Sequence, residues 1–259
     1  MCYWVGSRKV REALYKHFQE NPDDEIAQLY YQTFLASAAP GISFQEHWIA
    51  IGKSHPQLTA ITRENGIFRF RNLTWGLDWT YLNPSTGQEY SRELLNSTCE
   101  KVFWQHRDII YSRRCIVPVE GYFEFYHYKG NTYPHFLHPE SQTLFYLGGI
   151  WNSGVDKQTG EKKDTLSIIT TPPNDLTRFL HNNPDAPNGP RMLLIIEPGR
   201  IGEFLDEKLN QKGIATFFKP FPAEAMASHP TVRFLKREFA HLINSPQVQE
   251  PHYYPELSA

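Results

Sequence analysis

The sequence predicts an α+β fold whose core is a curled, largely antiparallel β-sheet, barrel-like in form and flanked by helices. Two observations support this class. Aromatic residues make up 14% of the 259 residues and there are 19 prolines, a composition typical of a chain rich in strands and turns. Short β-branched and aromatic segments also recur along the chain, with only short helical patches between them.

Two helices are expected near the start of the chain. Ser7 is placed to cap a helix that runs to about Phe18, with Val10 and Leu14 on its apolar face. The sequence Asn-Pro-Asp-Asp-Glu at 21–25 predicts a second helix start, because a capping residue is followed by proline and then by acids at the positive helix end.

The rest of the chain is predicted to be mostly strand. The expected strands are 47–51, 66–77, 113–128, 133–138, 143–153, 164–171, 191–198 and 216–221. The expected helical patches are about 90–105, 173–180, 198–209 and 231–242. Segments 154–164 and 182–190 have the composition of surface loops. Because no composition shift marks a boundary, we expect one domain over 1–259, with an extended tail from about 245.

Charge and cysteine content narrow the class of function. A formal net charge of −2 gives no overall basic field, so nucleic-acid binding must come from a local patch. The three cysteines are Cys2, Cys99 and Cys115, and no Cys-x-x-Cys pair predicts a zinc ribbon or a disulfide framework. A reducing bacterial cytoplasm is therefore the expected location.

Several features are expected to be absent. The first twenty residues are charged and lack the apolar stretch of a signal peptide, and no apolar run is long enough to span a membrane. Histidines and carboxylates offer no compact ligand set, so we expect neither a metal nor another cofactor. The protein is expected to be a monomer.

Cys2 is the first candidate for chemistry. If Met1 is removed, Cys2 carries an α-amine with a pKa of about 7.7–8.0 beside a thiol with a pKa of about 8.5. Such an aminothiol condenses with an aldehyde to a thiazolidine, or its thiolate attacks an acyl carbon while the amine acts as base. If Met1 stays, Cys2 is an ordinary thiol. The sequence leaves both alternatives open.

Three further polar residues are candidates. Glu124 shares one strand face with Tyr122 and Tyr126, where partial desolvation suits a proton shuttle unless that face is solvated. His181 ends a predicted helix, and the loop that follows is expected to expose it; a plain surface histidine is the alternative. Asn96 could hold the N-terminal backbone or a substrate oxygen, or could simply cap a helix.

Taken together, these residues resemble the SRAP family (SOS response-associated peptidase), whose members shield abasic sites in single-stranded DNA. The resemblance runs from Met1 to about residue 245 and is strongest over RRCIVPVEGYFEF at 113–125. Cysteine, Trp-Gly-Leu, asparagine, glutamate and histidine also follow one another in the family's order. The family fold is a mixed α/β domain around a curled antiparallel sheet, which agrees with the predicted strands.

The resemblance implies a role for each candidate. Cys2, freed of Met1, would be the nucleophile that crosslinks to an abasic site, with Asn96 positioning its terminus. Glu124 would shuttle protons during imine formation and ring closure. His181 would help to open the sugar ring and expose its aldehyde. The family name also implies autopeptidase removal of Met1, and the partner would be single-stranded DNA with abasic sites.

The DNA contacts are the least regular part of the resemblance. Arg191 would contact a phosphate, and Trp75 would stack near the lesion or wedge the strand. Arg113 and Arg114 form a local basic pair that could touch phosphates. The family usually has an arginine two residues after the cysteine and two after the asparagine, but here Tyr3-Trp4 follow Cys2 and Ser97-Thr98 follow Asn96. These departures predict weaker or altered DNA binding.

Two other functions remain open at this stage. Cys2 could serve a thiol amidase or peptidase that acts on a separate acyl substrate, which predicts turnover and a closed pocket. The chain could also be a binding module for nucleic acid or another partner, with Cys2 idle.

Overall fold

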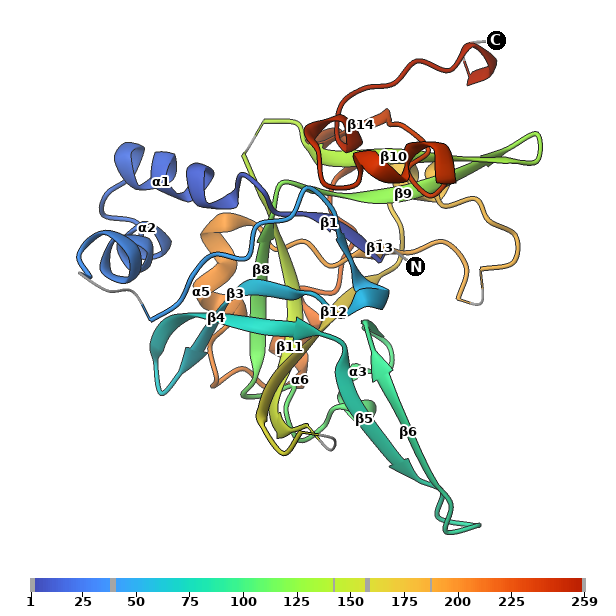
Figure 1. Ribbon diagram of the computed structural model, residues 1–259. Helices are drawn as coiled ribbons and strands as arrows, with labels where there is room; N and C mark the ends of the chain where they lie inside the picture. The colour runs from blue at the N-terminus through green and yellow to red at the C-terminus, as the bar shows by residue number, and fades with distance from the viewer. Residues whose placement is uncertain (1–2, 38–40, 142, 157–158, 187, 258–259) are drawn as a thin grey trace.

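A closed five-stranded barrel forms the centre of the molecule (Figure 1). The computed structural model describes residues 3–37, 41–141, 143–156, 159–186 and 188–257. The barrel strands pair in the order β11–β8–β3–β4–β12, and β12 pairs again with β11. Their bounds are β3 Gln57–Glu64, β4 Ile67–Trp75, β8 Arg114–Val119, β11 Phe145–Val155 and β12 Lys162–Thr171. Only the β4–β12 pair of the ring is parallel, so the predicted α+β, barrel-like class is confirmed.

Two short strands extend the barrel along β12. β7 (Asn96–Thr98) pairs with β12 in parallel and β13 (Met192–Leu193) pairs with it antiparallel. β7 begins at Asn96, and β13 begins directly after Arg191, so each strand brings a candidate residue to the barrel.

A second, five-stranded sheet carries the start of the chain. Its order is β14–β10–β9–β1–β2, and its bounds are β1 Trp4–Gly6, β2 Ala50–Ile51, β9 Gly121–Tyr128, β10 Asn131–Pro139 and β14 Met226–Pro230. β1 pairs with β9 through Val5↔Tyr122 and Gly6↔Gly121. Gly121 is required there, because a Cβ atom would lie 2.2 Å from the backbone oxygen of Leu137. A shared apolar core, which includes Tyr122 and Leu137, joins this sheet to the barrel.

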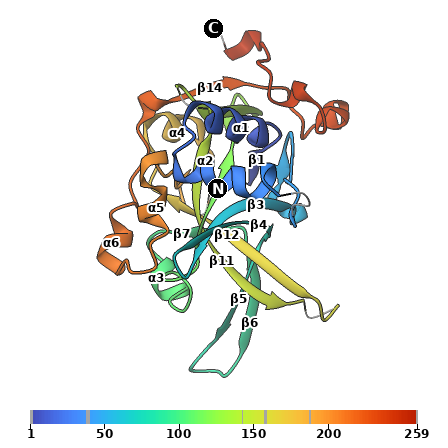
Figure 2. The same ribbon diagram turned by 90° about the vertical axis from the view of Figure 1, so that its left-hand side faces the viewer.

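The helices lie outside the strands, as Figure 2 shows for α1, α2, α5 and α6. Their bounds are α1 Val10–Glu20, α2 Glu25–Tyr30, α3 Val102–Gln105, α4 Asp175–Leu180, α5 Ile201–Phe204 and α6 Gln211–Ala215. The first two helices pack on the barrel through Leu14, Leu29 and Tyr30, which belong to a second apolar core. Burial of this kind, at about 25 cal/mol per Å² of apolar surface, is what holds such short helices in place.

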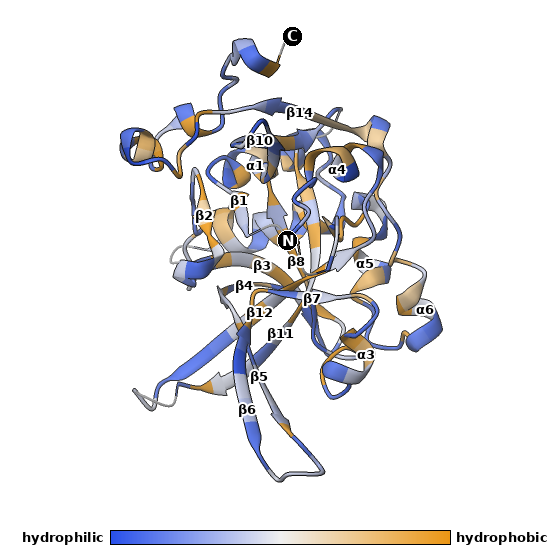
Figure 3. Cartoon of the chain, turned by 90° about the vertical axis from the view of Figure 1, so that its right-hand side faces the viewer, coloured by the Kyte–Doolittle hydropathy of each residue, from blue (hydrophilic) through white to orange (hydrophobic). Residues whose placement is uncertain are grey.

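A two-stranded hairpin projects from the barrel. β5 (Leu77–Leu82) and β6 (Glu89–Leu94) pair only with each other, and Figures 1 and 2 show them pointing away from the rest of the molecule. Most of their residues are exposed, and Figure 3 shows the hairpin as largely hydrophilic. Isolated hairpins are marginally stable, so contacts at its base must support it.

The two predicted helices near the start are confirmed, but neither has the expected cap, which was Ser7 for the first helix and Asn21 for the second. α2 is capped by Asp24, whose carboxylate accepts from Ile26 and Ala27. Ser7 does not cap α1: its hydroxyl donates to the backbone oxygen of Gln45 instead. The serine therefore ties the start of the chain to the segment before β2.

Other predicted elements were wrong. The helix expected at about 90–105 is in fact β6, β7 and the short α3, because the exposed hairpin has no apolar alternation that would mark it as strand. The strand expected at 216–221 is coil that follows α6. Of the helix expected at 231–242, only a 3₁₀ turn at Arg237–Leu242 forms, and 198–209 contains only a 3₁₀ turn and the four residues of α5. The barrel strand β3 was not predicted at all.

Part of the C-terminal segment packs on the second sheet. Its Val248 is buried in the same apolar cluster as Phe123 of β9 and Phe136 of β10. The assignment of one domain with a tail from about 245 stays a prediction. No helix in the described ranges is long and apolar enough to cross a membrane.

Candidate active site

A cavity of about 310 Å³ lies where the start of the chain meets β9 and the loop after α4. Tyr3 and Trp4 line it from the N-terminal side, Glu124 from β9, and His181 from the end of α4. Cys2 lies outside the described residues, but its covalent neighbour Tyr3 is part of the cavity wall. Two of the four predicted catalytic residues therefore share one cavity with the residue next to the third.

Glu124 and His181 face each other in this cavity. Nδ1 of His181 lies 3.5 Å from Oε2 of Glu124. Glu124 is 3% exposed and His181 is 5% exposed, so the expectation that the loop would expose the histidine was wrong. The second carboxylate oxygen, Oε1, is itself buried and makes no hydrogen bond to any described residue. A buried carboxylate next to an imidazole can pass a proton between them.

Local sequence explains how each of the two side chains reaches the cavity. Alternation along β9 puts Glu124 on the same face as Tyr122, while Phe123 packs in a separate apolar core on the other face. His181 follows the last residue of α4, and this helix packs on β9 through the stacked rings of Phe179 and Tyr126, 5.0 Å apart.

Asn96 does not cap a helix, so the capping alternative was wrong, and the residue before it, Leu95, lies near the start of the chain. Asn96 is the first residue of β7, opposite Ile168 of β12, and is buried. Gly52 shows the proximity: its amide donates to the backbone oxygen of Tyr3 at 2.8 Å. A Cβ atom on Gly52 would also lie 3.2 Å from the side chain of Leu95, the residue before Asn96.

Buried hydrogen bonds between hydroxyl and imidazole groups hold β7 in place through Ser97. The Ser97 hydroxyl lies 2.9 Å from Nε2 of His106 and 2.9 Å from the Ser167 hydroxyl. Burial lowers the pKa of His106 to about 4, so its imidazole is neutral near pH 7. The network fixes the strand that carries Asn96 to both α3 and β12.

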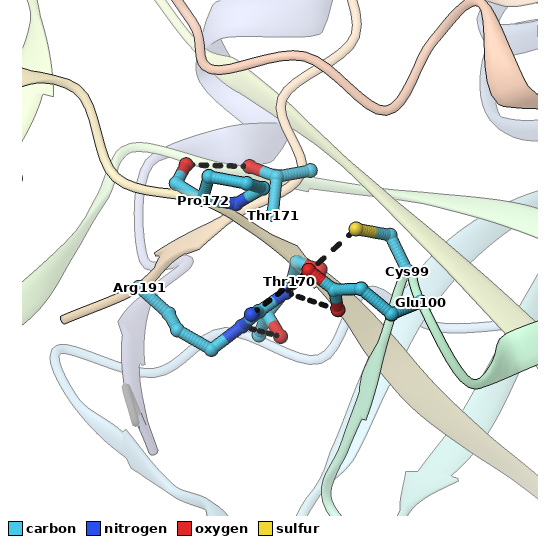
Figure 4. Close-up of polar contacts among 6 residues, drawn as sticks. All are labelled: Cys99, Glu100, Thr170, Thr171, Pro172 and Arg191. Carbon is cyan, nitrogen blue, oxygen red and sulfur yellow. Dashed lines mark hydrogen bonds and ion pairs between the residues drawn. The ribbon is translucent and has the colours of Figure 1, made fainter. Parts of the chain in front are cut away.

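Arg191 is bound within the protein, as Figure 4 shows, so its predicted phosphate contact is not supported. Its guanidinium donates to both carboxylate oxygens of Glu100, to the backbone oxygen and hydroxyl of Thr170, and to Sγ of Cys99. Burial, chiefly, raises the pKa of the Cys99 thiol to about 11, which leaves it unreactive near pH 7. A phosphate could reach Arg191 only by displacing these partners.

Trp75 does not stack on a base in this arrangement, which corrects the second predicted DNA contact. Its side chain is fully enclosed in the core between the sheets, and its Nε1 donates to the backbone oxygen of Leu95 at 2.8 Å. Its position nevertheless bears on the site, since it packs with Leu95 against Gly52.

Arg113 and Arg114 also serve the fold. Arg113 donates to Oδ1 of Asn152 and lies over the ring of Trp151. Arg114 is 2% exposed, and burial lowers its pKa to about 10. It donates to three backbone oxygens, those of Ile110, Phe204 and Asp206. A buried guanidinium with three internal acceptors is not available to DNA.

Some site residues had no clear signal in the sequence. Lys53 and the loop residues 183, 185, 186, 188 and 189 line the cavity, and Asp185 places an acid among them. Among the described lining residues Lys53 is the only lysine or arginine. The loop's Pro, Gly and Asn content predicted a surface loop, but nothing in its composition indicated that it walls a cavity.

A larger cavity, of about 530 Å³, lies between α1 and Trp48. Its cations include Arg8, whose guanidinium is paired with Glu46, and no cysteine or histidine lines it among the described residues. The smaller cavity is therefore the better candidate, because it holds the acid–base pair. No group of three His, Cys, Asp or Glu side chains in the described ranges could hold a metal ion.

Comparison with known proteins agrees with this picture. A model of the SOS response associated peptidase (SRAP) family matches residues 1–236. A crystal structure of a Bacteroides thetaiotaomicron protein is similar with a TM-score of 0.71 and 24% identity, over 97% of this chain and 100% of that chain. A Bordetella bronchiseptica protein gives 0.64 and 18%, over 89% and 99%, and a phage-related protein from the same organism gives 0.57 and 14%, over 90% and 95%. No curated protein matches.

Proposed function

The chain belongs to the SOS response-associated peptidase (SRAP) family, and from this premise we propose that it couples covalently to abasic sites in single-stranded DNA through Cys2. The family places the protein among peptidases associated with DNA damage. The observation that carries the finer proposal is the Glu124–His181 pair, which shares a cavity with Tyr3, the residue next to Cys2.

The first step is removal of Met1. Water adds across the Met1–Cys2 peptide bond, methionine leaves with a new carboxylate, and Cys2 gains a free α-amine. Consecutive Cα atoms are about 3.8 Å apart. Cys2 is therefore covalently tied to a residue, Tyr3, that lines the cavity. In this proposal Glu124 accepts a proton from the attacking water.

The second step joins the aminothiol to the lesion. The abasic sugar opens to an aldehyde, with His181 transferring the hydroxyl proton to the ring oxygen. The amine adds to the aldehyde carbon and one water leaves, which gives an imine. The thiol then adds across the C=N bond, its sulfur to carbon and its proton to nitrogen, and closes a thiazolidine. Glu124 accepts and returns the protons of these transfers, and the whole sequence releases one water.

The proposal is tested with matched oligonucleotides. One single strand contains a natural abasic site, and its control contains a tetrahydrofuran analogue, which has no hydroxyl at the anomeric carbon and cannot open to an aldehyde. We expect a denaturing gel to show a protein–DNA product only with the natural site. Equal products with both strands, or none with either, would contradict the aldehyde chemistry.

A second candidate is a thiol amidase that acts on a separate acyl substrate. It is favoured by one observation: the described cavity lining offers Lys53 as its single lysine or arginine and adds Asp185, which suits a small uncharged substrate better than a polyanion. Turnover of a panel of peptides and amides, abolished by Cys2→Ala, would support this candidate over the first.

A further inference from the structure

The side chain of Asn182 binds the backbone of β9 as a neighbouring strand would. Its Oδ1 accepts from the backbone N–H of His127 at 2.7 Å, and its Nδ2 donates to the backbone oxygen of His127 at 2.8 Å. One carboxamide therefore satisfies both hydrogen-bonding groups of a single strand residue. In an antiparallel sheet, a paired residue of the next strand makes this same double contact.

Strand geometry tells which edge of β9 Asn182 occupies. Backbone groups of successive strand residues point alternately to the two edges. Tyr3 and Ser7 bond to the segment around β2, so the even-numbered Gly6 directs its backbone groups to β9, where it pairs with Gly121. His127 lies six positions after Gly121, an even step, so their backbone groups point to the same edge. Asn182 thus sits on the edge of β9 that the N-terminal strand uses, further along it.

We infer that Asn182 is a positioning residue that holds His181 against Glu124. Asn182 directly follows His181, so its two bonds to β9 anchor the histidine to the strand that carries the glutamate. The catalytic part of this inference rests on the proposed function; the anchoring part does not. Asn182 touches no reacting atom and acts through His181.

The test compares Asn182→Ala and Asn182→Asp with a matched control, Asn210→Ala. Asn210 also binds backbone through its side chain, as the cap of α6, but it lies outside the site. Three readouts are taken: NMR hydrogen exchange of the His127 amide, NMR titration of the His181 imidazole, and the pH profile of single-turnover adduct formation. The aspartate variant keeps the acceptor for the His127 amide but loses the donor, and it serves if the alanine variant does not fold.

We expect both Asn182 variants to change the His181 titration and the pH profile, and to slow adduct formation roughly 10- to 100-fold, because misplaced catalytic groups lose rates of that order. In Asn182→Ala the His127 amide should also exchange roughly tenfold faster, since a net hydrogen bond is lost. Asn210→Ala should match the wild type in all three readouts.

The outcomes separate the two proposals. Unchanged exchange at His127 and an unchanged His181 titration would overturn the anchoring role. Altered exchange with a rate and pH profile like those of Asn210→Ala would overturn the positioning role. If the wild type forms no adduct at all, the proposed function fails, and the exchange and titration results alone decide whether Asn182 anchors His181.

Discussion

Glu124 illustrates how a single buried carboxylate becomes available for chemistry. Most of its neighbours on β9 are aromatic, and it shares the inner strand face with a tyrosine on each side. One carboxylate oxygen lies 3.5 Å from His181 and the other has no described hydrogen-bond partner. The carboxylate therefore keeps one oxygen without a described hydrogen-bond partner beside an imidazole, which supports its proposed role as proton shuttle.

Glu124→Gln should slow adduct formation by roughly 10²- to 10⁴-fold, because it keeps the shape but removes the proton acceptor. The rate is measured under single-turnover conditions with the abasic oligonucleotide. Glu140→Gln, a change at an exposed carboxylate, is the control and should react like the wild type. If Glu124→Gln reacts at the wild-type rate, the glutamate has no part in the mechanism.

His106 predicts a specific loss of stability in acid. Burial holds its pKa at about 4 in the folded protein, against 6.5 in a free histidine. Between pH 6.5 and about 4, His106 therefore binds a proton in the unfolded chain but not in the folded protein. Its contribution, on the order of 3 kcal/mol, is present above pH 6.5 and is lost as the pH falls toward 4.

Urea unfolding at a series of pH values measures this effect. His106→Gln should flatten the fall in unfolding free energy between pH 6.5 and 4, because glutamine can still bind Ser97 but does not titrate there. His241→Gln, which replaces an exposed histidine, should leave the slope as it is. An equal slope in wild type and His106→Gln would contradict the buried neutral imidazole.

At the scale of elements, the chain's own periodicity predicted most of the strands that line the core, with β3 as the exception, but not β6, which stands apart from the core. β9 to β12 alternate apolar and polar residues or are continuously apolar, and their positions were predicted closely. β6 is exposed along most of its length, so no apolar period marks it. The run Arg92–Leu95 also contains glutamate and two leucines, which are good helix formers, and this composition favoured the helix expected at 90–105.

The site was predicted in part for the same kind of reason. Glu124 stood out as a polar residue on an aromatic strand, and His181 stood out at a helix end before a loop. The contacts that make Trp75 and Arg191 unavailable to DNA could not be predicted. Their partners, Leu95 and Glu100, lie far from them in sequence and are brought close by the pairing of β7 with β12. Sequence alone gives a residue's type, whereas its availability depends on such partners.

At the scale of the whole molecule, charge is the feature that most limits the proposed partner. The net charge is −2, and the arginines at 113, 114 and 191 are engaged inside the protein. Lys53 is the single lysine or arginine among the described residues of the cavity wall. Non-covalent affinity for DNA should therefore rest on few phosphate contacts, and stable attachment should depend mainly on the covalent step.

Salt dependence tests this directly. With one or two phosphates neutralised, affinity of a Cys2→Ala protein for single-stranded DNA should fall only about 3- to 7-fold between 50 and 200 mM salt. Lys53→Ala should reduce that dependence, while Lys219→Ala, a change at an exposed lysine outside the cavity lining, should not. A fall of about a hundredfold or more would reveal a basic surface elsewhere on the molecule.

The central claim is that Cys2 is a processed N-terminal aminothiol that couples to an abasic aldehyde. Intact mass spectrometry of the untagged protein, alone and after mixing with an abasic single strand, measures both parts at once. We expect the protein to lack Met1 and the mixture to contain a protein–DNA product one water lighter than the sum of its parts, absent with Cys2→Ala. A protein that retains Met1 and forms no product, or a Cys2→Ala protein that still forms it, would contradict the claim.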